Sequence, residues 1–177
     1  RPIVEGTLAE LGPKDMARMG PLVLLVIAFV LFLVLKSIVR VVTTLFAVAA
    51  SVLWSFGLMS FLGIPLYSVS IMIPVMLVAI GVAYAIHLYG DIDHHVKGFP
   101  AASRREIAEH AVASVGTPAF YAALTTVAGF IALLTSRVYP VKYFGLFTAF
   151  GVAVSWLLTM ILVPAVLVAF VTVRRKK

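Results

Sequence analysis

The stretch GVAYAIHLYGDIDHH, residues 81–95, gathers side chains that can carry protons at the end of a long apolar run. On a helix, Tyr84, His87 and Asp91 fall at i, i+3 and i+7 and therefore form one stripe. Histidine titrates near neutral pH, and an ionisable group inside an apolar segment often serves a proton or ion pathway. The same residues could instead mark the place where a helix leaves an apolar environment for water.

The two ends of this stretch favour different explanations. The four outer residues lie where the helix should already be hydrated, so a solvated helix end explains them more simply than a functional site: Asp91, Asp93, His94 and His95. His87 lies one to two turns further inside. It could carry protons, or be a buried histidine that bonds a carbonyl or a threonine of another helix.

A metal site is the sharper alternative for the same residues. His87 and Asp91 are spaced i, i+4, and so are Asp91 and His95, which can put two ligands on one helix face. A stable site needs three or four ligands, however, and the chain has no cysteine. We therefore expect neither a metal nor another cofactor.

The composition points to a membrane protein. Of the 177 residues 63% are hydrophobic and 12% are charged, whereas a soluble domain is about half apolar and about a quarter charged. The net charge is +7, but the basic residues sit in short breaks between apolar runs, with no basic face that would suit a nucleic acid. No nucleophile–base pair or acid pair has usable spacing, so we do not expect an enzyme.

Five apolar runs have roughly the 20 residues that a membrane-spanning helix needs. They are long and do not alternate, which favours helices over barrel strands. We therefore predict an all-α integral membrane bundle in residues 20–173, between a lead-in over 1–19 and a basic tail over 174–177. The predicted spans are about 20–39, 41–62, 66–89, 112–135 and 143–173, with one long connection over 91–111.

Local signals add detail to the predicted spans. Ser103 and Glu106 have the spacing of a capping box, which predicts a short helix that lies on the membrane surface within the long connection. Pro118 is expected near a helix start, where proline is tolerated, whereas Pro74 is expected to kink the third span.

The charges between the spans predict an orientation. With an outside N-terminus, nine of the 14 Lys and Arg residues lie inside and five outside. The positive-inside rule therefore predicts an outside N-terminus and a cytoplasmic C-terminus. Because the chain begins at Arg1 and not at methionine, we expect a piece of a longer protein.

Other spans contribute candidate residues. Small residues let helices approach closely, and we assign this packing role to Gly81, Gly129, Gly145 and Gly151. Thr125 and Thr126 in the fourth span could join a proton relay with Tyr84, His87 and Asp91, or simply bond a carbonyl of their own helix.

Several stretches together resemble the RND superfamily of exporters. The run PLYSVSIMIPV (65–75), leading into GVAYAIHL (81–88), is similar to the fourth transmembrane helix of the MMPL-type branch, which exports hydrophobic molecules and is related to Patched and to sterol-sensing domains. Further stretches resemble the start of its second helix, its fifth helix and its sixth: DMARMGPLVLLVI (15–27), ALTTVAGFIALLTS (123–136), and FGLFTAFGV (144–152) with LLTMILVPAVL (157–167).

The resemblance implies one transmembrane half that lacks its first helix. In that family the proton-motive force drives external porter domains that carry lipids or other hydrophobic molecules. The implied partners are membrane lipids, the missing half and porter domains, and protons as the coupling ion. The implied location is a bacterial or archaeal cytoplasmic membrane, and an oligomer is one alternative.

One departure from the family pattern concerns the proton carrier. Many members have an acid in the motif Gly-x-Asp-Tyr, where this chain has Gly81 and Tyr84 but Ala83 at the acid position. His87 is the natural substitute on chemical grounds. Two alternatives stay open: this half has lost proton coupling and is a scaffold, or the chain is a sterol-sensing-like lipid-binding or regulatory module without transport.

Overall fold

A computed structural model of the chain describes residues 21–22, 25–99 and 102–170, and within these ranges all regular secondary structure is helical. The prediction of an all-α membrane bundle is therefore confirmed. In the described ranges, four helices are long and apolar enough to cross a membrane. The elements are a helix over Leu25–Leu35, α2 (Ile38–Phe61), η1 (Ser68–Ile71), α3 (Met72–Gly98), α4 (Arg104–Ala132), η2 (Leu133–Thr135) and α5 (Tyr139–Phe170).

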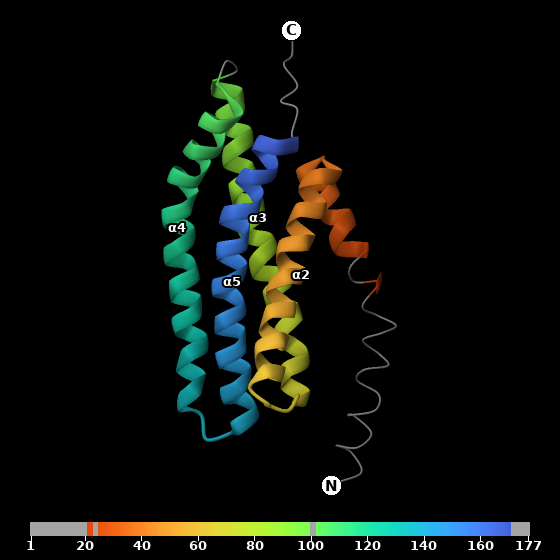
Figure 1. Ribbon diagram of the computed structural model, residues 1–177, viewed down its shortest axis with the longest axis vertical. Coiled ribbons are helices and arrows are strands. Elements are labelled where there is room, and N and C mark those ends of the chain that lie inside the picture. The colour runs from red at the N-terminus through yellow and green to blue at the C-terminus, as the bar shows by residue number, and fades with distance from the viewer. Residues whose placement is uncertain (1–20, 23–24, 100–101, 171–177) are drawn as a thin grey trace.

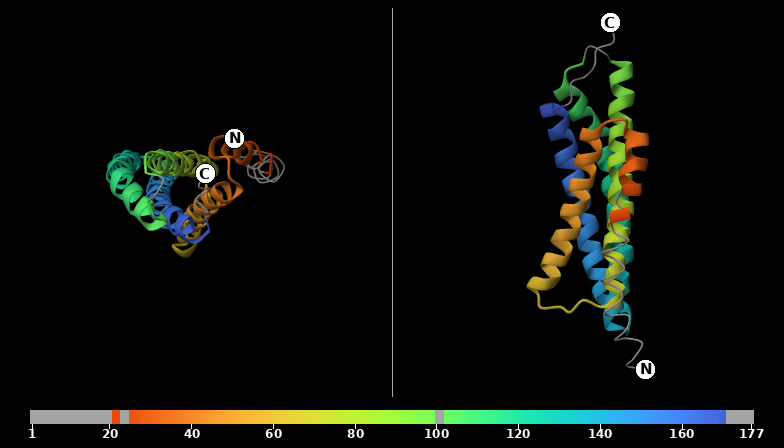
Figure 2. Two further views of the ribbon diagram at one scale, coloured as in Figure 1. Left: turned by 90° about the horizontal axis from the view of Figure 1, so that it is seen from above. Right: turned by 90° about the vertical axis from the view of Figure 1, so that its right-hand side faces the viewer.

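The long helices run alternately up and down the bundle (Figures 1 and 2). α3 and α5 pack against each other, and each also packs against α2 and α4. One buried apolar cluster, which includes Leu88 and Ile107, lies where α3 ends and α4 begins. A second cluster, which includes Leu77 and Phe147, lies further along α3 and α5. The helices are thus held together along their length by apolar side chains.

The break between the second and third spans lies where the sequence predicts it, whereas the break between the first and second lies at Lys36 and Ser37, inside the first predicted span. Lys36 has a φ of 50° and separates the Leu25–Leu35 helix from α2. Gly63, with a φ of 67°, follows the end of α2 and needs the left-handed conformation that glycine adopts easily. Of the first predicted span, the structure describes 21–22 and 25–39. The predicted lead-in over 1–19 and the tail over 174–177 lie outside the described residues.

The capping box at the start of α4 is confirmed. The Ser103 hydroxyl accepts the Glu106 backbone N–H at 3.2 Å, and the Glu106 carboxylate accepts the Ser103 N–H at 2.7 Å. The prediction of a separate short surface helix was wrong, because α4 continues without a break to Ala132. Ile107 and Ala111 are buried against α3, so this segment packs into the bundle.

The two prolines do not lie where the sequence predicts them. Pro74 lies in the first turn of α3, where a missing N–H costs little, and Pro118 lies in the interior of α4. The prediction for Pro118 failed because α4 begins at Arg104, well before the start expected near Val112. The prediction for Pro74 failed because α3 begins at Met72, after the short helix η1, and not near Leu66.

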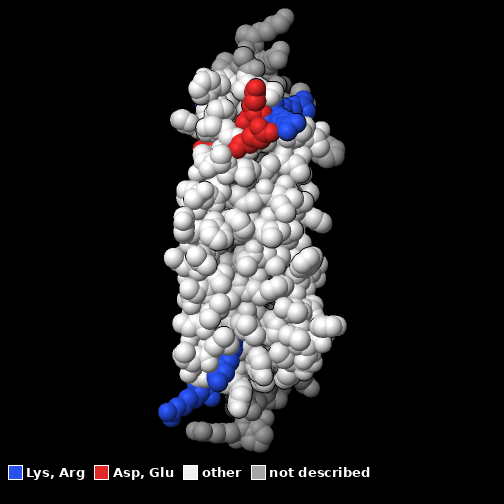
Figure 3. All heavy atoms as spheres, turned by 60° about the vertical axis from the view of Figure 1, so that its left-hand side comes forward, with Lys and Arg blue, Asp and Glu red and all other residues white. Residues whose placement is uncertain are grey.

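Charged side chains of the described residues gather at the two ends of the bundle. On the face in Figure 3, a broad uncharged band separates a mixed acidic and basic end from a basic end. All the described acidic residues lie at the mixed end, where Lys and Arg outnumber them only slightly. That end has Lys36, Arg40, Asp91, Asp93, Lys97, Arg104, Arg105, Glu106 and Glu109, and the other has Arg137 and Lys142. This distribution suits a membrane-spanning bundle.

Candidate proton-handling site on α3

The predicted stripe on α3, which includes Tyr84 and His87, lies at the border between the buried and the exposed face of the helix. Tyr84 is buried in the cluster with Leu77 and Phe147, whereas His87 is exposed. Three helical steps separate the two side chains by about 60° around the helix axis. Tyr84 therefore faces the bundle, and His87 faces away from it.

His87 belongs to a continuous row of exposed positions, which we call the uncovered face of α3: Ala79, Ala83, His87, Gly90 and His94. In α3, the large exposed hydrophobic side chains end at Met76. By contrast, α2 exposes bulky apolar groups such as Leu53 and Trp54. Small residues are typical of close helix–helix contacts in membranes, so the uncovered face has the composition of a contact with another helix and not of a lipid-facing surface.

Asp91 is turned toward α4. The Ser114 hydroxyl donates to Asp91 Oδ2 at 2.7 Å, and His110 Nδ1 lies 3.6 Å from the same oxygen. The His95 ring stacks on His110 with 3.9 Å between ring centroids. These groups connect α3 to α4 and are not joined to His87. Within the described ranges, no three His, Cys, Asp or Glu side chains gather as a metal site would require.

A second polar connection joins α2 to α3, and the sequence did not reveal it. Arg40 donates from both terminal nitrogens to the two oxygens of Asp93, each at 2.7 Å. Its guanidinium carbon also lies 5.2 Å from the centroid of the Tyr89 ring. The Arg40 side chain is 14% exposed and that of Asp93 48%, so the guanidinium is largely shielded from solvent while the carboxylate remains half exposed.

Thr125 and Thr126 do not reach α3. Both hydroxyls donate to the Ala122 carbonyl in their own helix, at 3.0 and 2.8 Å. The local alternative for these threonines is therefore the one that the structure adopts. Tyr84, His87, Asp91 and the two threonines are not assembled into one hydrogen-bonded relay in the described part of the chain.

Three of the four packing glycines lie at close helix contacts. A Cβ at Gly81 would lie 2.5 Å from Ser155 Oγ, and one at Gly151 would lie 2.5 Å from atoms of Ser55 and Leu77. A Cβ at Gly145 would lie 2.5 Å from a backbone carbonyl of α4. Gly129 does not lie at such a contact among the described helices, because it is exposed and a Cβ there would meet no atom within 4 Å.

A row of buried hydroxyls between α2 and α5 was also missed; we call it the hydroxyl seam. It comprises Thr44, Ser51 and Ser55 on α2 and Thr148, Ser155 and Thr159 on α5, all at most 1% exposed. Each set has the spacing i, i+7, i+11, which is a visible helical stripe in the sequence. The hydroxyls of Ser155 and Thr159 have no hydrogen-bond partner among the described residues. Hydroxyls can bind water, but they do not take up a proton at ordinary pH.

The comparisons with known proteins agree with this architecture. The chain is 29% identical over 150 residues to the protein named "Putative membrane protein MJ1562" from Methanocaldococcus jannaschii. The match covers 84% of this chain but 36% of that relative, so the chain spans little more than a third of the relative's length. A model of the MMPL family, which is part of the RND superfamily, matches residues 3–177. With nearly every residue inside that match, this membrane protein belongs to the MMPL family.

Proposed function

We propose that the chain is the transmembrane part of a proton-motive-force-driven exporter of lipids or other hydrophobic molecules. In this proposal His87 exchanges protons at a contact between α3 and a second transmembrane half. The observation that carries the proposal is the position of His87 on the uncovered face of α3, among small residues.

An ionisable side chain in an apolar helix is costly where it faces lipid, so it normally faces protein or water. His87 lies one helical turn, about 6 Å, before Asp91 along α3, on the apolar side of the charged end. The small residues Ala83 and Gly90 beside it would let another helix approach closely enough to shelter the imidazole. A second half that covers this face would provide that shelter.

The position of Ala83 supports His87 as the proton carrier. Ala83 occupies the place of the acid in the family motif, and both residues lie on the uncovered face, one turn apart. An imidazole at 87 can therefore reach the region that an acid at 83 would serve. Because histidine titrates near neutral pH, it can take up and release a proton under a moderate gradient.

The charges favour one orientation in the membrane. Five described Lys and Arg residues lie at the end where α3 meets α4, against two at the opposite end. The positive-inside rule then favours a cytoplasmic location for the first end, in a bacterial or archaeal cell. The porter domains and the second half would come from the rest of a longer protein, as the short coverage of the relative suggests.

The test uses the full-length protein in proteoliposomes with an imposed pH gradient and a fluorescent lipid. We expect gradient-dependent lipid flux, and loss of most of it in His87→Ala. His94→Ala is the matched control: this histidine lies on the same face but among the charged residues at the end of α3, so its loss tests whether removing any imidazole from that face lowers the flux, and we expect the flux to be kept. Saturable lipid binding without gradient-dependent flux would instead support a sterol-sensing-like module, and full flux in His87→Ala would refute the role of His87.

A further inference from the structure

Three titratable side chains meet between the end of α3 and the first turns of α4, and we call them the histidine joint: Asp91, His95 and His110. The His95 and His110 rings stack with 3.9 Å between their centroids and 20° between their planes. His110 Nδ1 lies 3.6 Å from Asp91 Oδ2, so the stack has a carboxylate on one side. The proposed exchange of protons at His87 uses none of these three side chains.

The histidine joint is open to solvent. The His110 side chain is 49% exposed and that of Asp91 26%. Next to it, Ile107 and Ala111 of α4 are buried in the apolar cluster that α4 shares with α3. Protons can therefore reach the two imidazoles from solution without first breaking the apolar contact between the helices.

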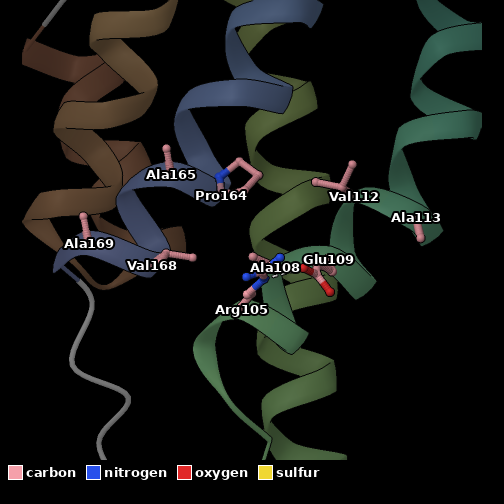
Figure 4. Close-up of a pocket in the computed structure, with 9 residues that line it drawn as sticks. All are labelled: Arg105, Ala108, Glu109, Val112, Ala113, Pro164, Ala165, Val168 and Ala169. Atoms are coloured by element: carbon pink, nitrogen blue, oxygen red, sulfur yellow. Dashed lines mark hydrogen bonds and ion pairs between the residues drawn. The ribbon is translucent and has the colours of Figure 1, made fainter.

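The charged side chains of the neighbouring helices are engaged elsewhere. The one charged residue of α2, Arg40, pairs with Asp93, and the one of α5, Lys142, lies at the opposite end of the bundle. The four charged side chains of α4 have partners outside the joint: Arg105 with Glu109 beside the groove between α4 and α5 (Figure 4), Arg104 with the Val168 carbonyl, and Glu106 with the Ser103 N–H.

The other charged or titratable groups at this end of α3 point away from the joint. His94 belongs to the uncovered face, and Asp93 pairs with Arg40. Lys97 is exposed and lies two residues after His95, which is about 200° around the helix axis. Among the described residues, Asp91 is therefore the one acid in contact with the two stacked imidazoles.

One carboxylate can balance one imidazolium but not two. A single protonated ring suits the geometry, because it can pair with Asp91 while it stacks on a neutral ring. Two protonated rings would place like charges 3.9 Å apart. Even in bulk water, that repulsion corresponds to about a fivefold change in an equilibrium constant.

We propose that the histidine joint is a pH-sensitive contact between α3 and α4. It holds the first turns of α4 against α3 near neutral pH and loosens when acid protonates both imidazoles, because histidine titrates in this range. The contact responds to the pH on the side of the membrane where the charged end lies. It requires no transport, so it does not depend on the proposed function.

The experiment compares unfolding of the chain by SDS in mixed micelles at about pH 7.5 and about pH 5.5. Acidification should raise the unfolding constant of the unaltered chain about fivefold more than that of His95→Gln. In this variant His110 keeps Asp91 but has no charged ring beside it. His94→Gln is the matched control, because it removes an exposed imidazole one residue away, and it should respond to acid as the unaltered chain does.

Two further measurements test the carboxylate and the movement. Asp91→Asn removes the charge that balances the first proton, so acid should destabilise this variant more than the unaltered chain. Spin labels at Lys97→Cys and Ala113→Cys, both exposed positions, report the distance between the two helix ends. Acid should broaden the distribution of that distance in the otherwise unaltered chain but not in His95→Gln.

Three results would overturn the proposal. The first is an equal response to acid of the unaltered chain and His95→Gln in the unfolding assay. The second is a response of His94→Gln as small as that of His95→Gln, which would show that any imidazole at this end has the same effect. The third is a distance distribution that stays the same at both pH values, which would show that the joint does not loosen.

Discussion

Replacing Gly145 by alanine should force α4 and α5 apart. A Cβ at this position would lie 2.5 Å from the Phe130 carbonyl oxygen and 2.7 Å from Leu133 Cβ. Neither atom can move away by a side-chain rotation, because one belongs to the backbone and the other is attached directly to it. The helices themselves must shift.

The expected magnitude follows from comparing Gly145→Ala with Gly129→Ala. Alanine is favoured over glycine in a helix interior by about 1 kcal/mol, and this gain is common to both variants. Overpacking at a tight contact costs about 1–3 kcal/mol, and only position 145 has such a contact. The free energy of unfolding of Gly145→Ala should therefore be about 1–3 kcal/mol lower than that of Gly129→Ala.

Unfolding by SDS in mixed micelles provides the measurement. Trp156 on α5 lies 5.3 Å from Phe120 on α4, ring centroid to ring centroid, so its fluorescence reports on the same helix contact. A Trp54→Phe background removes the other tryptophan. Equal stability of the two alanine variants would show that the contact at Gly145 is not as tight as the structure indicates.

The same unfolding assay tests three other contacts. Arg40→Ala should lower the free energy of unfolding by about 1–2 kcal/mol, because it breaks the bidentate pair with Asp93, and a double-mutant cycle with Asp93→Asn should give a coupling of about 1 kcal/mol. If the losses in the free energy of unfolding from the two changes simply added, Arg40 and Asp93 would not interact as the structure indicates. Ser155→Ala should be neutral or stabilising, because it removes a buried hydroxyl that has no described partner. Ser55→Ala should cost about 1 kcal/mol, because it removes a bond to the Ser51 carbonyl, and a larger loss in Ser155→Ala would argue for a bound water there.

Local sequence signals predicted where caps and breaks occur better than they predicted how far each helix extends. The capping box at Ser103 and the break at Gly63 depend on neighbouring residues, and both are found as expected. The continuity of α4 depends on the burial of Ile107 and Ala111 against α3, and no local pattern reveals that contact. The role predicted for Pro118 was wrong for the same reason, because the longer α4 puts this proline in the helix interior.

The site was less predictable than the fold. Spacing alone could not tell that Tyr84 and His87 lie on different faces, because their 60° separation crosses the border of the buried face. Arg40 and Asp93 are 53 positions apart, so their ion pair has no local signal. The hydroxyl seam, by contrast, is visible as two matching helical stripes and could have been found by comparing the second and fifth spans.

The most direct test of the account asks whether protein covers the face of α3 that includes His87. A fluorescent probe is attached at Ala83→Cys, in a chain that has no other cysteine in its 177 residues, and its quenching by brominated lipids is measured. Leu53→Cys on α2, where the native side chain is 71% exposed, is the lipid-facing control. We predict strong quenching at both positions in the isolated chain, but at position 53 alone in a full-length protein whose other cysteines are removed. Equal quenching at position 83 in the full-length protein would show that His87 lies beside lipid, and would contradict its role at a contact between two halves.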